Sequence, residues 1–294
     1  MDKKFKQYTL TLQKIRDVGD TKVGQETNFG CIAINGKKAY CIKTNTANTS
    51  SDLFYYSDYS NTKVSPKQVV IKNKLGHGNG VAYYNNALWV ATRTKNIVKI
   101  DLNDNYKRYT FAPSSGDVSV SGITHFHDDT FIVKTGSGNY NGEKYIEYKV
   151  ITFGKDKKYS FDGTKPIKVI NPKYDNLFRV PQDICYHNGN LYIILGKREN
   201  PNDPKSPIKE NAILVVDLSN RHTVTKGLEG NIAKDSYPEY FYPQEILVVK
   251  KKTHTSYELE SLDFDSNGNM IVAANIVGNG DHDSILKVTK KTAM

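Results

Sequence analysis

Short runs of alternating apolar and polar residues, separated by polar turns, recur along this chain. The period of two places the apolar side chains of each run on one face of a strand. The turns carry Asn, Asp or Gly, which are typical of tight hairpins. The clearest two-strand units are 30–42, 79–90, 121–133, 182–193 and 260–272, and third strands follow at 96–102, 212–218 and 284–290. No window keeps a period of 3.6 residues, so we expect almost no helix.

The repetition of these units predicts a β-propeller, because one small sheet cannot bury both of its faces alone. We expect an all-β fold with a single domain over residues 1–294. It would be a five-bladed β-propeller with blades near 28–74, 75–117, 118–172, 178–240 and 241–294. The last unit ends too close to residue 294 to supply a fourth strand, whereas residues 7–13 alternate cleanly. We therefore expect the N-terminal strand to join the last blade, which removes an exposed edge. A sixth blade would have to come from residues 227–257, which contain one good strand at 245–250.

The inner strand of each unit has one apolar column and neighbouring small residues. The column consists of Ile32, Val81, Ile123, Ile184 and Leu262. It should pack between blades, while the small residues beside it let adjacent sheets approach closely. Asp183 and Asp263 interrupt the small positions, so they are candidates for a special role.

Composition adds limits rather than a function. The 294 residues carry a formal net charge of +10, which suits an anionic partner as well as simple solubility. No apolar run is long enough to cross a bilayer, and residues 1–8 do not resemble a secretory signal. We expect a cytoplasmic protein or one secreted without a standard leader. Cys31, Cys41 and Cys185 fall in small or apolar columns, so we expect structural thiols and no disulfide framework.

A ligand would bind where the inner strands begin, because loops from every blade meet there. The opening residues are Gly30, Asn79, Ser121, Gln182 and Glu260. We expect His77, Asn79, Gln182 and Glu260 to hydrogen-bond a ligand, and Arg93 and Lys197 to bind its anionic groups. The alternative is that these polar residues only solvate a water-filled channel.

Three short segments stand out among the units: 77–80 (HGNG), 182–192 (QDICYHNGNLY) and 258–262 (ELESL). They resemble blades of the helveticin J family, whose members are large bacteriocins of Gram-positive bacteria. The resemblance implies a propeller-like extracellular protein that binds or acts on the envelope of competing bacteria. It also implies export without a standard leader.

Specific catalytic and metal-binding functions have less support in the sequence. A glycan-cleaving enzyme needs two carboxyl groups beside the scissile bond, and Glu260 with Asp183 is the pair that the inner strands offer. The early blades have no acid at the matching position. His125 and His127 have a spacing that zinc could use, but His125 lies in an apolar column. We therefore expect no metal and no cofactor, and no nucleotide-binding motif is present.

The function that we expect from these patterns is a non-catalytic, bacteriocin-like binding protein. Its partner would be a bacterial surface glycan or an anionic envelope polymer, with no specific nucleic acid, no membrane span and a monomeric state. The alternatives are a glycan-cleaving hydrolase or lyase, and a protein-interaction scaffold. The aromatic segment 236–244 would be either a lid that contacts glycan or a connection packed on the body.

Overall fold

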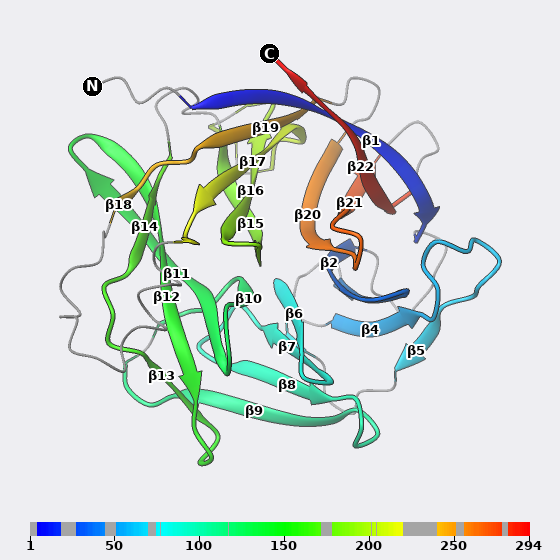
Figure 1. The fold of residues 1–294 in the computed structure, drawn as a ribbon, viewed down its shortest axis with the longest axis vertical. Coiled ribbons are helices and arrows are strands. Elements are labelled where there is room, and N and C mark those ends of the chain that lie inside the picture. Colours follow the sequence, from blue (N-terminus) through cyan, green and yellow to red (C-terminus); the bar gives the residue numbers. More distant parts are fainter. Residues whose placement is uncertain are drawn as a thin grey trace.

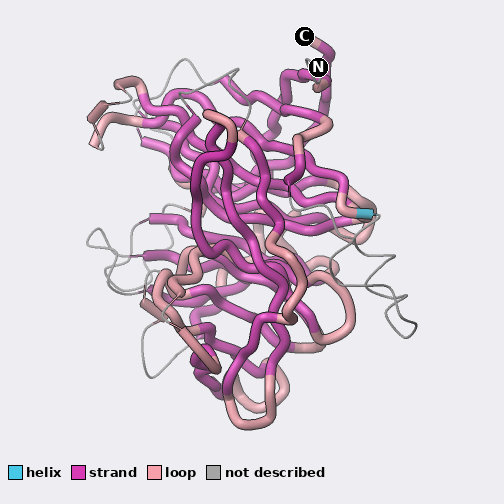
Figure 2. Tube along the Cα trace, turned by 90° about the vertical axis from the view of Figure 1, so that its left-hand side faces the viewer, coloured by secondary structure: helices cyan, strands magenta, loops and turns pink. Residues whose placement is uncertain are grey.

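The chain folds into short antiparallel sheets arranged around a central axis, as the computed structural model shows (Figure 1). The structure describes residues 5–18, 28–44, 51–69, 75–76, 78–116, 118–171, 178–200, 202–203, 205–219, 240–250, 256–277 and 282–294. The elements bounded in these ranges are strands, so the all-β prediction is confirmed and the arrangement is propeller-like (Figure 2). In the same ranges, no helix has the length and apolar character needed to cross a bilayer.

Most strands belong to meanders that begin at the axis and run outward. The first contains β2 (Asn28–Asn35), β3 (Lys38–Thr44), β4 (Ser51–Tyr56) and β5 (Lys67–Val69). The second contains β6 (Gly80–Tyr84), β7 (Ala87–Ala91), β8 (Ile97–Asp101) and β9 (Lys107–Pro113). The third contains β10 (Ile123–His125), β11 (Thr130–Tyr140) and β12 (Glu143–Phe153), and both β13 (Lys158–Phe161) and β14 (Ile167–Ile170) pair with β12.

The remaining strands complete the circle. The fourth meander contains β15 (Phe178–His187), β16 (Asn190–Arg198), β17 (Ile208–Asp217) and β19 (Glu245–Lys250). The fifth contains β20 (Ser256–Phe264), β21 (Met270–Val277), β22 (Ser284–Ala293) and β1 (Lys6–Asp17). Parallel pairing of β1 with β19, and of β13 with β9, joins neighbouring meanders at their outer edges. As a result, eight strands form one continuous sheet and ten form another, while β2–β5 remain a separate four-stranded sheet.

The two ends of the chain meet in the same meander. β1 lies antiparallel to β22 from Tyr8 opposite Ala293 to Asp17 opposite Ser284. The N-terminal strand therefore does join the last unit, and it extends beyond the 7–13 expected from alternation. This pairing covers the outer edge of β22 and leaves no open edge at the junction between chain ends.

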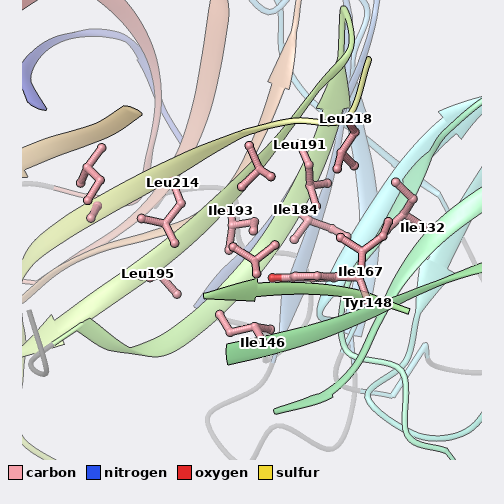
Figure 3. Close-up of a cluster of buried hydrophobic side chains, with 14 of the residues drawn as sticks. Ile132, Ile146, Tyr148, Ile167, Ile184, Leu191, Ile193, Leu195, Leu214 and Leu218 are labelled. Carbon is pink, nitrogen blue, oxygen red and sulfur yellow. The ribbon is translucent and has the colours of Figure 1, made fainter. Parts of the chain in front are cut away.

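Inner strands β2, β6, β10, β15 and β20 surround the axis, each in contact with the next and β20 in contact with β2. The predicted apolar column is buried along this ring: Ile32, Val81, Ile123, Ile184 and Leu262 are at most 5% exposed. Apolar clusters fill the wedges between meanders. Figure 3 shows the one between the third and fourth meanders, where Ile132 and Tyr148 face Ile184 and Ile193.

Side chains beside the axis hydrogen-bond the backbone of the neighbouring inner strand. Asp263 Oδ2 accepts a 2.7 Å hydrogen bond from Ile34 N, and Thr124 Oγ1 accepts one of 2.8 Å from Tyr186 N. Asp263 is one of the two acids that interrupt the small positions. Its role in the structure is to tie the last inner strand to the first, and burial raises its pKa to about 6.

For the long fourth connection, one expectation needs correction and one open alternative is narrowed. The strand at 245–250 pairs with β17, so the boundary expected at 240/241 moves to a point after Lys250. The segment 236–244 lies partly outside the described residues, but its described part packs on the third meander. There β18 (Tyr240–Phe241) pairs with β14, and Tyr240 stacks on Tyr140 with ring centroids 3.8 Å apart. These contacts favour the packed connection over the lid.

Candidate functional site

The inner strands are irregular where they begin. The pairing register shifts between Phe29 and Cys31, between Pro181 and Ile184, and between Leu259 and Ser261. Each shift leaves an extra residue on the inner strand, which is the geometry of a β-bulge. The bulged residues include Gly30, Gln182 and Glu260, three of the strand-opening residues singled out in the sequence. Because a bulge turns its side chain away from the ordinary alternation, these positions can face the mouth of the axis.

A cavity of about 510 Å³ opens at this end of the axis. All five strand-opening positions contribute to its wall. The lining residues are Asn28, Phe29, Gly30, Thr44, Gly78, Asn79, Arg93, Ser121, Lys134, Val180, Pro181, Gln182, Arg198, Glu258, Glu260 and Asn275. They come from all five meanders, so the site exists only when the ring is closed. The volume lies within the range typical of small-molecule sites.

The predicted ligand-binding residues divide into three groups. Asn79, Arg93, Gln182 and Glu260 line the cavity. His77 lies outside the described residues. Lys197 is not part of the lining, and its ammonium group is 3.2 Å from Glu210 Oε1 on the neighbouring strand β17. Whether the four lining residues bind a ligand stays a prediction.

The cation that β16 supplies to the cavity is Arg198 rather than Lys197. Neighbouring residues of a strand point to opposite faces, and the β16–β17 register shifts between these two. Arg198 is held from behind by a 2.8 Å hydrogen bond from Nη1 to Ser206 O. Two adjacent basic residues look alike in a sequence, so only the pleat and the register could distinguish them.

Glu258 is a second carboxyl group in the wall, two residues before Glu260 on β20. The side-chain amide of Gln182 donates a hydrogen bond to Glu258 Oε1. Burial raises the pKa of Glu258, while this hydrogen bond and the positive charge of Arg198 oppose the rise. The spacing of 258 and 260 on one strand was a usable signal for Glu258, which was named from the sequence only within the segment 258–262.

Glu260 is the most strongly perturbed carboxyl group of the wall. Its pKa is raised well above the ordinary value, first by burial and then by the negative charge of Glu258. A hydrogen bond with the Asn275 side chain acts in the opposite direction. Two neighbouring carboxyl groups with different partners are the arrangement that separates an acid from a base in one site.

A basic arc lies across the axis from the carboxyl groups. Lys134 is on β11, and Arg93 follows β7 with a left-handed φ of 59°. Lys134 Nζ donates a 2.9 Å hydrogen bond to Ser121 Oγ, and Asn79 Nδ2 donates one of 2.6 Å to Ser121 O. Burial and the nearby charge of Arg93 lower the pKa of Lys134. Residues 134–140 and 143–145 belong to the ends of β11 and β12 that lie nearest each other in the sequence.

Asp183, the second acid of the expected enzyme pair, lies beneath the cavity. It is 1% exposed and does not contribute to the lining. Its Oδ2 accepts a 2.7 Å hydrogen bond from Ser261 Oγ, and burial raises its pKa to about 8. The structure therefore does not bring Asp183 to the cavity surface with Glu260, as the expected pair requires. Glu258 takes its place in the wall.

Other candidate chemistries gain little from the structure. Within the described ranges, no three His, Cys, Asp or Glu side chains gather as a metal site would require. His125 stacks on Tyr84 with ring centroids 3.8 Å apart, in keeping with a packing role. Cys31, Cys41 and Cys185 are buried and free, so the prediction of structural thiols is confirmed.

Comparison with known proteins yields a fold likeness without a family. No protein-family model matches the chain, and no curated protein matches it. A solved glutaminyl cyclase from Myxococcus xanthus is similar, with a TM-score of 0.52 and 10% identity over 99% of this chain and 100% of that one. An α-L-arabinofuranosidase from Podospora anserina, solved with cellotriose, has a TM-score of 0.51 and 10% identity over 97% and 98%. An exo-1,5-α-L-arabinanase from a bovine ruminal metagenomic library has a TM-score of 0.50 and 10% identity over 92% and 97%.

These likenesses show the fold, and they correct the leading functional expectation. All three proteins are enzymes by name, and two of them act on glycosidic bonds. The expectation of a non-catalytic, bacteriocin-like binding protein is therefore not retained. The resemblance to the helveticin J family, and the bacterial envelope as a partner, stay predictions.

Proposed function

We propose that this protein is a glycan-cleaving enzyme whose carboxyl pair is Glu260 and Glu258. The observation that carries the proposal is the pair itself: two partly buried glutamates with raised pKa values in the wall of one polar cavity. Hydrolysis of a glycosidic bond needs one protonated and one ionised carboxyl group on either side of the bond. The likeness to an arabinanase and an arabinofuranosidase supports the same class of reaction.

The surroundings of the two glutamates suggest their roles. Glu260 lies beside the negative charge of Glu258, which favours retention of its proton. Glu258 has Gln182 and the positive charge of Arg198 to stabilise its ionised form. Glu260 is thus the general acid and Glu258 the base. A group whose pKa is raised toward neutrality is suited to giving a proton at physiological pH.

In the proposed reaction, Glu260 gives its proton to the glycosidic oxygen as the bond from that oxygen to the anomeric carbon breaks. Glu258 removes a proton from a water molecule, whose oxygen forms the new bond to the anomeric carbon. One water is consumed for each bond cleaved. Transfer of a proton from Glu258 back to Glu260 restores both groups. Asn275 and Gln182 are positioning residues, since each hydrogen-bonds one of the two carboxyl groups.

We also propose that the five meanders are the blades of a five-bladed propeller. The closed circle of contacts through β2, β6, β10, β15 and β20 supports this count. The long sheets then result from edge pairing between blades, through β1 with β19 and β13 with β9. Five blades leave a narrow axis, which is consistent with a cavity confined to one end.

The experiment is incubation of the purified protein with a panel of plant and isolated Gram-positive cell-wall polysaccharides in ¹⁸O-labelled water. We expect release of reducing ends that carry one ¹⁸O atom, which identifies hydrolysis. E260Q and E258Q should each lower the rate by about a hundredfold or more, as expected for loss of a general acid or base. E199Q, at an exposed carboxyl group on a loop, should retain activity.

The outcomes separate the alternatives. Reducing ends without ¹⁸O, together with an unsaturated sugar, would replace the hydrolase with a lyase. An unchanged rate in both E260Q and E258Q would overturn the assigned pair. A folded protein that cleaves no member of the panel would count against the enzyme proposal as a whole.

A further inference from the structure

The cavity has an uneven distribution of charge. Both carboxyl groups come from β20, whose neighbours around the axis are β15 and β2. Lys134 and Arg93 belong to the third and second meanders, which lie across the axis from β20. The third cation, Arg198, is near enough to Glu258 to lower its pKa, so it belongs to the acidic side. One wall of the cavity therefore carries the two carboxyl groups with Arg198 beside them, and the opposite wall carries Lys134 and Arg93.

The basic wall is fixed in place by hydrogen bonds. Lys134 Nζ is tied to Ser121 Oγ at 2.9 Å, and the Ser121 carbonyl is tied in turn to Asn79 Nδ2 at 2.6 Å. Lys134 also lies at a register shift between β11 and β12, where the strand departs from regular pairing. A lysine held in this way has already lost much of its side-chain freedom, so binding an anion costs it little additional entropy.

Lys134 is partly buried and Arg93 is exposed, and two like charges on one side of a cavity repel each other. The effect is visible at Lys134, whose pKa is lowered by burial and by the charge of Arg93. An anion placed between the two cations reduces the cost of burying Lys134 and the repulsion between the two charges. It does so because it supplies opposite charge and hydrogen-bond acceptors. A single negative charge suits the site better than a dianion, since Glu258 and Glu260 lie across the same cavity.

We propose that the glycan cleaved by this protein carries an acidic sugar, and that Lys134 and Arg93 bind the carboxylate of a hexuronic acid in the cavity. The assignment rests on the proposed function in one respect, namely that the anion belongs to the substrate. Asn79 and Ser121 lie next to the carboxylate position and can hydrogen-bond the hydroxyl groups of the same ring. The net charge of +10 adds a long-range attraction for a polyanionic glycan.

The test compares sugars that differ only at the sixth carbon. Binding of glucuronic acid and galacturonic acid is measured by calorimetry against glucose and galactose, with wild-type protein and with E260Q. We expect each uronic acid to bind at least about tenfold more tightly than its neutral partner in both proteins, as a charge-assisted hydrogen bond implies. The difference should shrink as salt is raised.

Variants locate the binding group. K134M keeps the aliphatic stem and should remove most of the preference, whereas K134R should keep it. K290M, at an exposed position on β22, is the matched control and should change nothing. If K134M does not fold, R93Q gives the same test from the second meander.

The outcomes distinguish this inference from the proposed function. Preferential binding of uronic acids without cleavage of any glycan would support the acidic-sugar site and count against the enzyme. Cleavage of a neutral glycan with no preference for uronic acids would leave the enzyme standing and overturn the inference. Equal competition by inorganic phosphate or sulfate would also overturn it, because it would indicate a general anion site.

Discussion

Ser261 donates a 2.7 Å hydrogen bond to Asp183 beneath the floor of the cavity, and so connects the fifth meander to the fourth. Both side chains are at most 1% exposed. The same serine oxygen accepts a 3.2 Å hydrogen bond from Ile32 N in the first meander. One small side chain thus joins three inner strands at the axis, and it follows the proposed acid Glu260 in the sequence.

The first prediction concerns pH and stability at Asp183. Burial raises the pKa of Asp183 from 3.8 to about 8, so the folded protein holds a proton that the unfolded chain releases. Its contribution to stability is therefore complete below the unfolded value and is lost as pH rises toward about 8. Between about pH 5 and pH 8.5, the free energy of unfolding should fall less in D183N than in wild type. The difference between the two slopes should be at most about 1.4 kcal/mol for each pH unit. Urea unfolding at the two pH values measures the difference.

Glu260 and Asp263 also have raised pKa values, so the wild-type stability should fall with pH even beyond the contribution of Asp183. The comparison with D183N isolates one of these groups. S261A provides a second check, because the Ser261 hydrogen bond opposes the rise in the Asp183 pKa. In S261A the loss of stability should shift to higher pH. Parallel pH dependence in wild type and D183N would contradict the prediction.

The second prediction concerns the close approach of inner strands at Gly80. A Cβ atom at this position would lie 2.6 Å from Asp183 Oδ1 and 3.0 Å from the backbone of Gly122 and Ile123. G80A should therefore destabilise the protein by about 1–3 kcal/mol, as overpacking of a core does. G136A is the matched control, because a Cβ at Gly136 meets nothing within 4 Å. Equal thermal unfolding of the two variants would show that the strands can separate without cost.

The third prediction concerns the pH profile of the proposed enzyme. The hydrogen bond from Asn275 favours the ionised form of Glu260 and so lowers its pKa. In N275A the pKa of Glu260 should rise further, and the acid form should persist to higher pH. The alkaline limb of the kcat/KM profile should shift to higher pH. N139A, at an exposed position on β11, should leave that limb unchanged. A downward shift in N275A would assign that limb to a different group.

The fourth prediction concerns closure by the N-terminal strand. Leu10 is 6% exposed on β1 and packs in the cluster that contains Leu247 and Leu286. L10A should cost about 2–5 kcal/mol of stability, as expected for a leucine truncated in a core. Q13A changes an exposed side chain of the same strand and should cost little. Chemical unfolding monitored by circular dichroism measures both, and a small effect of L10A would indicate that β1 contributes pairing without packing.

The local alternation of apolar and polar residues was sufficient to predict the strands, the apolar column of the inner strands and the N-terminal strand that closes the ring. Alternation with a period of two decides which side chains are buried, and Ile32, Val81, Ile123, Ile184 and Leu262 are buried as expected. The residues that open the inner strands were also identified, because their position follows from the repeat. All five line the same cavity.

Tertiary structure alone decided which polar groups share the site. Glu258 and Arg198 meet only because β20 and β15–β16 come from adjacent meanders, and Lys134 faces them only because the ring closes. The choice of Arg198 over Lys197, and the burial of Asp183 beneath the floor, depend on bulges and strand register. A shift of one residue reverses the face of every side chain, and alternation within one strand does not specify its register with the next. The sequence by itself therefore determined where the strands and the mouth of the axis lie, and the closed ring determined the chemistry found there.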